Sequence, residues 1–123
     1  MARILLVDDD PGVMQLLDTT LTRAGHAVTA CADGAAARDA ATATVEPFDL
    51  IVTDFRLGEG TGLDLVARLR DDGVTARCIL VTGDPSVPET HAATLRALAC
   101  DHVLGKPFRP SDLRAAVTAV MDR

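Results

Sequence analysis

Short apolar runs of strand length alternate with helical patterns along the whole chain, and this alternation restricts its fold more than any other feature. The runs are rich in Ile, Leu and Val and lie at residues 3–7, 26–30, 49–53, 77–81 and 102–104. Helical patterns follow each of them, at residues 13–24, 34–44, 63–69, 87–98 and 113–120. Strands that are buried on both faces read as continuous apolar runs, and parallel neighbours need a covering crossover. The pattern therefore predicts an α/β fold, a doubly wound (βα)₅ unit with a five-stranded parallel sheet.

Length and hydropathy predict one domain. The chain has 123 residues, of which 48% are apolar, which is enough for one core and too few for two. No uninterrupted apolar stretch exceeds four residues, whereas a membrane span needs about 18 and a signal peptide needs a shorter run. We therefore expect residues 1–123 to form a single cytoplasmic domain that neither contacts a membrane nor carries an output domain.

The composition excludes several classes of function. The chain has 18 acidic and 12 basic residues, so its net charge of −6 disfavours direct binding to nucleic acid phosphates. It has three Phe and neither Trp nor Tyr, so it lacks aromatic walls for stacked bases or for a flavin. The cysteines Cys31, Cys78 and Cys100 are odd in number and form no CxxC pair, which argues against a zinc site or a disulfide scaffold. We interpret them as small buried hydrophobes rather than as redox sensors.

Polar residues follow the predicted strands, at the edge where ligands of open parallel sheets bind. They are Asp8, Asp9 and Asp10 after the first strand, Asp54 after the third, Thr82 after the fourth and Lys106 after the fifth. In the flavodoxin-like strand order 2-1-3-4-5, the first and third strands flank the point where the winding reverses. That order would place Asp8, Asp9 and Asp54 in one crevice.

These residue types suit metal-dependent phosphoryl transfer. Clustered carboxylates repel one another unless their pKa values rise or a cation joins them. Mg²⁺ is typically held by one or two carboxylates, with waters and phosphate oxygens as its other ligands. An aspartate can itself be the nucleophile, and a lysine and a hydroxyl can contact the phosphoryl oxygens. Lys106 is the one lysine among the 12 basic residues.

Four motifs resemble those of a known family, the CheY-like receiver domains of two-component response regulators. They are LLVDDD at 5–10, TDFRL at 53–57 with GTGL at 60–63, VTG at 81–83, and KPF at 106–108. The resemblance covers the whole chain. It implies that Asp54 accepts a phosphoryl group from a phosphohistidine of a sensor histidine kinase or of a histidine phosphotransfer protein. It also implies that the domain catalyses only its own phosphorylation and dephosphorylation.

The resemblance assigns roles to the other motif residues. Asp9, Asp54 and the main-chain carbonyl of Arg56 would hold Mg²⁺, with Asp8 in a supporting position. Thr82 and Lys106 would contact the phosphoryl oxygens, and the Lys106–Pro107 peptide bond would be cis.

Other positions would affect the lifetime of the phosphoryl group and the contact with an output partner. We expect the side chains of Arg56 and Asp84 to overhang the site, to pair across the phosphoryl group and to set its lifetime. The switch position of the family carries Phe or Tyr, and this chain has Val103 there. Gly58 replaces a common proline and should loosen its loop. Residues 85–99, 102–104 and 110–121 would face an unidentified output protein or a second copy of the chain.

Other functions remain as alternatives. The chain would be a receiver fragment of a larger regulator or of a hybrid histidine kinase, or a pseudo-receiver that binds partners without phosphorylation. A phosphatase of the haloacid dehalogenase type is disfavoured, because it needs a carboxylate two residues after the nucleophile, where this chain has Arg56.

Overall fold

The computed structural model describes residues 1–58 and 60–122. Its central sheet contains β1 (Arg3–Val7), β2 (Ala27–Cys31), β3 (Leu50–Asp54), β6 (Arg77–Thr82) and β7 (His102–Gly105). These strands are parallel and lie in the order β2-β1-β3-β6-β7. The helices are α1 (Pro11–Arg23), α2 (Gly34–Ala43), α3 (Gly62–Asp71), α4 (Val87–Thr90), α5 (Ala92–Ala97) and α6 (Pro110–Met121). The predicted doubly wound fold, with strand order 2-1-3-4-5, is confirmed.

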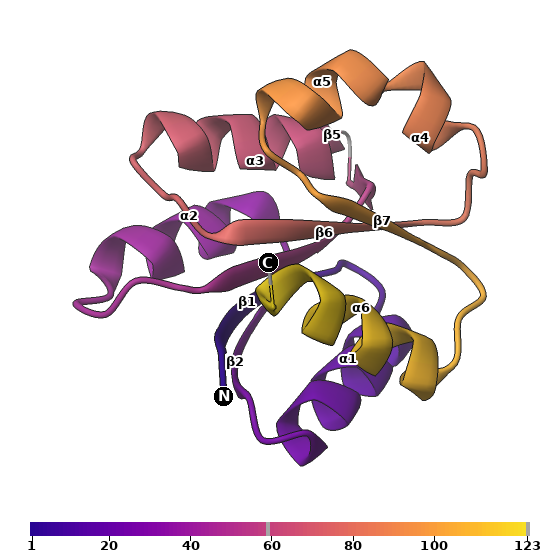
Figure 1. The fold of residues 1–123 in the computed structure, drawn as a ribbon. Coiled ribbons are helices and arrows are strands. Elements are labelled where there is room, and N and C mark those ends of the chain that lie inside the picture. Colours follow the sequence, from indigo (N-terminus) through magenta and orange to yellow (C-terminus); the bar gives the residue numbers. More distant parts are fainter. Residues whose placement is uncertain (59, 123) are drawn as a thin grey trace.

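The helices form one layer on each face of the sheet. Helices α1 and α6 lie side by side on one face, and α2, α3, α4 and α5 cover the other (Figure 1). Strand residues alternate between two cores: in β1, Leu5 and Val7 pack toward α2 and α3, whereas Ile4 and Leu6 pack toward α1 and α6. Because both faces are covered, each central strand is apolar on both sides and needs no polar alternation.

The structure differs from the sequence expectation in its local details. Strands β2 and β3 each begin one residue later than predicted, at Ala27 and Leu50. The helix expected over 87–98 is interrupted at His91, whose φ of −111° and ψ of 20° lie outside the helical range. A short antiparallel hairpin, β4 (Arg56–Leu57) with β5 (Gly60–Thr61), was not predicted, because two-residue strands leave no periodic signal.

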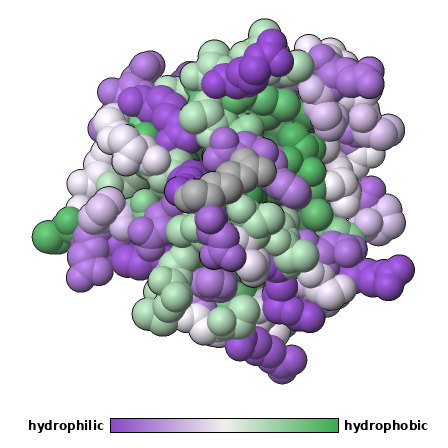
Figure 2. Space-filling view, in the orientation of Figure 1, coloured by the Kyte–Doolittle hydropathy of each residue, from purple (hydrophilic) through white to green (hydrophobic). Residues whose placement is uncertain are grey.

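The surface of one face is mixed in hydropathy. Figure 2 shows hydrophilic residues around the periphery and apolar residues gathered below the layer of α4 and α5. Within the described part of the chain, no helix is long and apolar enough to cross a membrane.

Candidate functional site

Backbone pairing at the carboxyl edge of the sheet brings the predicted polar residues together. Asp54 is the last residue of β3 and lies opposite Val81 of β6. The amide of Phe55 continues this ladder by donating to the carbonyl of Val81 at 2.8 Å. The amide of Lys106 donates to the carbonyl of Thr82 at 2.7 Å. Asp54, Thr82 and Lys106 therefore meet because their strands end at one edge.

The acidic cluster forms as the sequence predicted. Asp8, Asp9 and Asp54 each place one carboxylate oxygen within 4.8 Å of those of the other two. Asp8 is 1% exposed and Asp54 is 9% exposed, whereas Asp9 lies on the surface. Asp10 is occupied differently, because its side chain caps α1 by accepting from the amides of Gly12 and Val13.

Asp8 carries a buried oxygen without a hydrogen bond. Its Oδ1 accepts from the Asp10 amide at 2.8 Å, but its Oδ2 has no hydrogen-bond partner. Lys106 Nζ lies 4.0 Å from that oxygen, too far for a hydrogen bond. Burial raises the pKa of Asp8, and the nearby charges of Asp54 and Asp9 add to this effect, while the Asp10 amide and Lys106 oppose it. A buried, unsatisfied carboxylate oxygen among other carboxylates fits a divalent cation.

Lys106 is the nearest cation to the phosphoacceptor candidate. Its Nζ lies 3.4 Å from Oδ1 of Asp54, and its side chain is 27% exposed. The ammonium group can therefore contact both Asp54 and a ligand that enters from solvent.

A cavity of about 560 Å³ opens at this edge of the sheet. It is lined by Asp54, Arg56, Thr82, Gly83, Asp84, Pro85 and Lys106. Thr82 Oγ1 accepts from the amide of Asp84 at 3.0 Å, which leaves its own O–H free to donate into the cavity. The volume of the cavity is ample for a phosphoryl group and its waters.

Arg56 and Asp84 both line this cavity, but their side chains form no ion pair with one another. The Asp84 carboxylate instead accepts from the amide and the hydroxyl of Ser86, at 2.9 and 2.7 Å. These bonds lower the pKa of Asp84, and the charge of Arg56 lowers it further.

The hairpin and α3 position the loop beyond Asp54. The amide of Gly58 donates to Asp9 Oδ2 at 3.0 Å, and Gly58 has a φ of 58°, which glycine adopts most easily. Gly62 approaches β3 closely: a Cβ there would lie 2.2 Å from the carbonyl oxygen of Asp54. Glycine therefore suits position 58 by its backbone angle and is required at position 62 by the lack of space. The Lys106–Pro107 peptide bond is cis, as predicted.

The sequence did not predict an aromatic contact behind the site. The rings of Phe55 and His91 lie 5.2 Å apart at an angle of 53°. His91 occupies the break between α4 and α5, so this contact joins the residue after Asp54 to the helical layer. Val103, the predicted switch position, is half-buried on β7 against the same core. A histidine near the middle of a helical pattern gives no sequence signal for such a partner.

Comparisons with known proteins agree with this geometry. A family model described as the response regulator receiver domain matches residues 4–118. The alginate biosynthesis transcriptional regulatory protein AlgB of Pseudomonas syringae pv. tomato is 35% identical over 98% of this chain and 26% of its own length. The transcriptional regulatory protein GlrR of Escherichia coli K12 is 31% identical over 99% of this chain and 27% of its own length. The chain thus spans about a quarter of these relatives.

A solved structure of similar size also matches. The chemotaxis response regulator CheY4 of Vibrio cholerae superposes with a TM-score of 0.87 at 30% identity, covering 98% of each chain. The fold, the order of the motifs and the family match all agree. The chain therefore belongs to the response regulator receiver domain family of two-component systems.

Proposed function

We propose that this receiver accepts a phosphoryl group on Asp54 in a Mg²⁺-dependent reaction. The observation that carries the proposal is the position of Asp54 between the cation and the carboxylates. Its Oδ1 lies 3.4 Å from Lys106 Nζ, and one of its oxygens lies within 4.8 Å of those of Asp8 and Asp9. The phosphodonor is the phosphohistidine of a sensor histidine kinase or of a histidine phosphotransfer protein.

Each of these residues would have a distinct role in the phosphoryl transfer. A carboxylate oxygen of Asp54 attacks phosphorus, an O–P bond forms, and the bond between phosphorus and the donor nitrogen breaks. Lys106 supplies a positive charge and Thr82 supplies a hydroxyl donor for the phosphoryl oxygens. Water later hydrolyses the acyl phosphate, so the domain modifies only itself and is not an enzyme acting on other substrates.

The acidic cluster fits Mg²⁺. Asp9, Asp54 and the carbonyl of Arg56 would hold the ion, with Asp8 supporting them through its unsatisfied buried oxygen. When bound, Mg²⁺ would offset the negative charge that builds up on the transferred group.

Arg56 and Asp84 would tune the lifetime of the acyl phosphate. Both line the cavity, and the electrostatic effect of Arg56 on Asp84 supports their proximity. The charges of the two side chains would pair across the phosphoryl group and control the approach of water. Their alanine variants should change the rate at which the adduct decays in the assay described below.

The signal would leave through the face formed by residues 85–99, 102–104 and 110–121. The contact between Phe55 and His91 supports this route, because it joins the loop beside Asp54 to α4 and α5. Val103 lies on the same face without the aromatic ring of the family pattern. The partner would be an output protein or a second copy, and residues 1–123 would act as one receiver unit, alone or within a larger regulator.

Incubation with acetyl phosphate and Mg²⁺, followed by intact-mass measurement, tests the proposal. We expect one phosphoryl adduct on the wild type, none on Asp54→Ala and none after chelation of Mg²⁺. Asp39→Ala, on the exposed surface of α2, is a matched control that should keep the adduct. If acetyl phosphate and a cognate kinase both leave the folded wild type unmodified, the chain is a pseudo-receiver that only binds partners.

A further inference from the structure

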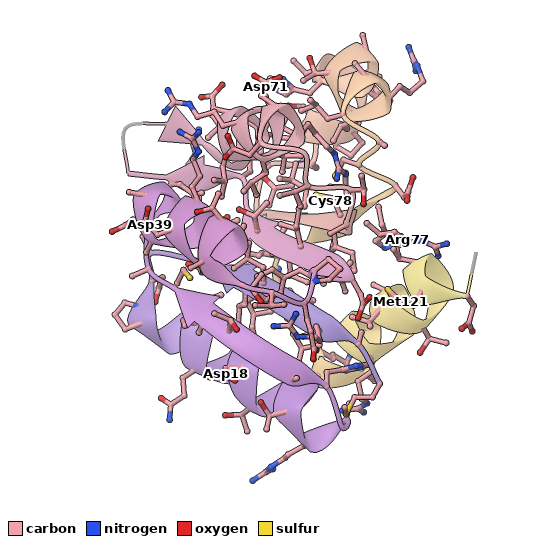
Figure 3. The ribbon with its side chains drawn as sticks, turned by 90° about the vertical axis from the view of Figure 1, so that its left-hand side faces the viewer. Asp18, Asp39, Asp71, Arg77, Cys78 and Met121 are labelled. Carbon is pink, nitrogen blue, oxygen red and sulfur yellow. The ribbon has the colours of Figure 1, made fainter. Side chains whose placement is uncertain are left out.

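From the sequence we interpret the cysteines as small buried hydrophobes, but two of the three meet in the core although they are 22 residues apart. Cys78 lies near the start of β6, and Cys100 lies two residues before β7. Their Sγ atoms are 3.2 Å apart, which is shorter than an ordinary van der Waals contact between two sulfur atoms. Figure 3 shows Cys78 in the interior of the molecule, while its neighbour Arg77 points out toward α6 near Met121.

The backbone fixes Cys100 in this position. Helix α5 ends in a Schellman motif: the Cys100 amide donates to the Leu95 carbonyl and the Ala99 amide donates to the Arg96 carbonyl. Ala99 has a φ of 54°, and the chain turns there so that Cys100 faces Cys78. From 3.2 Å, the sulfur atoms need to approach one another by only about 1 Å to reach the roughly 2 Å of a disulfide.

The two thiols are not equivalent. Cys78 is fully buried, whereas Cys100 is 8% exposed. The hydrogen bond between the two thiols lowers the pKa of Cys100, and the backbone of His102 adds to this effect against the cost of burial. The same pairing raises the pKa of Cys78. Cys100 is therefore the thiol that more readily becomes a nucleophilic thiolate.

A guanidinium group and a cavity lie beside the pair. Arg70 donates to the carbonyls of Leu98, Val74 and Ala76, at 2.9, 3.0 and 2.6 Å, and its charge favours the thiolate forms of both cysteines. The cavity has a volume of about 350 Å³. Arg70 lines it together with Ala99 and Asp101, the two neighbours of Cys100. The cavity thus lies next to Cys100, at the edge of the sheet opposite Asp54, although neither cysteine lines it.

We propose that Cys78 and Cys100 form a reversible intrachain disulfide when the protein is exposed to hydrogen peroxide. The Cys100 thiolate attacks the peroxide, the O–O bond breaks, and a sulfenic acid and one water form once the departing hydroxide takes a proton. Cys78, after losing its proton, attacks the sulfur of Cys100, an S–S bond forms and a second water leaves. Two thiols are oxidised and one hydroperoxide is reduced. The bond would tie β6 to the turn before β7, beneath the face proposed for output.

Thiol counting on the wild-type chain tests this proposal. The folded protein is treated with hydrogen peroxide, the excess is removed with catalase, and the denatured chain is alkylated with N-ethylmaleimide. Alkylation should fall from three cysteines to one, with Cys31 as the remaining site. The unalkylated oxidised protein should be lighter by the mass of two hydrogen atoms, and dithiothreitol should restore three alkylated thiols.

Cys31 provides an internal control, because it is buried without a thiol partner and burial raises its pKa. The Cys31→Ala variant should lose both of its remaining thiols on oxidation, and Cys100→Ala should lose the crosslink. The proposal is overturned if all three thiols stay alkylatable, if Cys78 and Cys100 gain oxygen instead of losing hydrogen, or if the disulfide involves Cys31 or joins two chains. Since the decisive measurement uses the wild type, it does not depend on the folding of any variant.

Discussion

At the scale of single residues, the buried carboxylate of Asp8 is the main source of unfavourable electrostatics in the site. Its buried Oδ2 has no hydrogen bond, Lys106 Nζ lies 4.0 Å away, and two further carboxylates lie nearby. Without metal, ionised Asp8 therefore destabilises the folded state, whereas a bound divalent ion would remove that cost. The same side chain should thus oppose folding and favour metal binding.

The variant Asp8→Asn separates these two effects. Removing the buried charge should raise the free energy of unfolding without metal by about 1 kcal/mol. It should also weaken Mg²⁺ binding by about tenfold or more. Urea titrations with and without Mg²⁺ measure both quantities. Asp9→Asn is the comparison, since Asp9 is exposed and should affect metal binding without the stabilisation. A less stable Asp8→Asn protein in the absence of metal would contradict the argument.

His26 gives the fold a dependence on pH that is independent of the site. Its Nδ1 accepts from the Ala2 amide at 3.0 Å, and burial lowers its pKa below the ordinary 6.5, helped by the charge of the N-terminus. The unfolded chain therefore binds a proton at His26 at a higher pH than the folded chain does. Stability should fall as the pH drops below 6.5, until the folded form is protonated as well.

Urea midpoints measured above and below pH 6.5 test this dependence by comparing the wild type with His26→Gln. The glutamine oxygen can still accept from Ala2 but does not titrate in this range. The difference in stability between the two proteins should move in favour of His26→Gln as the pH falls. A difference that stays constant across this range would show that His26 is not responsible.

At the scale of elements, helix α3 begins directly behind the phosphoacceptor candidate. Thr61 caps the helix in a capping box with Asp64, and the Gly62 amide donates to the Phe55 carbonyl. No side chain fits at position 62, since its Cβ would overlap the backbone of Asp54. The position of the Asp54 backbone therefore depends on a glycine in the next helix.

Gly62→Ala should destabilise the fold by roughly 2–4 kcal/mol, because backbone must move to admit the methyl group. Gly34→Ala is the matched control at the first residue of α2. Its Cβ would meet only Leu65 Cδ1 at 3.6 Å, an ordinary contact, and the change should be neutral or slightly stabilising. Thermal unfolding of the two variants checks the contrast. Equal effects at both positions would refute the role given to Gly62.

Three helices end in the same Schellman motif, but one of them uses a non-glycine residue. Gly25 and Gly73 occupy the left-handed position after α1 and α3, with φ of 94° and 90°, and Ala99 occupies it after α5. The left-handed conformation costs an alanine about 1–2 kcal/mol. A glycine would avoid this cost but would lose about 0.5–1 kcal/mol through the greater freedom of its unfolded chain.

The balance predicts that Ala99→Gly stabilises the protein by about 0.5 kcal/mol. The reverse change, Gly73→Ala, should destabilise it by a similar or larger amount, and no atom lies close enough to its Cβ to add a steric term. Chemical denaturation of both variants measures whether each change raises or lowers the free energy of unfolding. If both changes destabilise, the side chain of Ala99 contributes more by packing than its backbone costs.

At the scale of the whole molecule, the parallel sheet explains what the sequence could predict. The polar residues of the site lie at the last position of a strand or just after it, so their meeting depends on strand order: Asp8, Asp54, Thr82 and Lys106. The contacts of Phe55 with His91 and of Cys78 with Cys100 depend on where the helical layer settles, and no spacing encodes them. The α4–α5 break and the two-residue hairpin are likewise results of tertiary packing. The sites assigned to Mg²⁺ and to phosphate stay predictions.

The position of the cysteine pair also has a consequence for overall stability. A bond between Cys78 and Cys100 would close a loop between residues 22 apart in the chain. Loop closure of this length reduces the freedom of the unfolded chain and should stabilise the fold by about 3 kcal/mol. The peroxide-treated protein should therefore melt roughly 10 °C higher than the reduced protein. Scanning calorimetry with and without dithiothreitol measures the shift, and a lower melting temperature after oxidation would indicate that the bond strains the core.

Lys106 is the only lysine of the chain, and this has a consequence for chemical labelling of the site. The single side-chain amine stands 3.4 Å from Asp54, at the wall of the cavity. A reagent that acylates amines has one side-chain target, the Lys106 amine, which nearby carboxylates partly shield. The reactivity of that one group therefore reports whether the cavity is open or filled, and the protein carries a chemical probe of its own site.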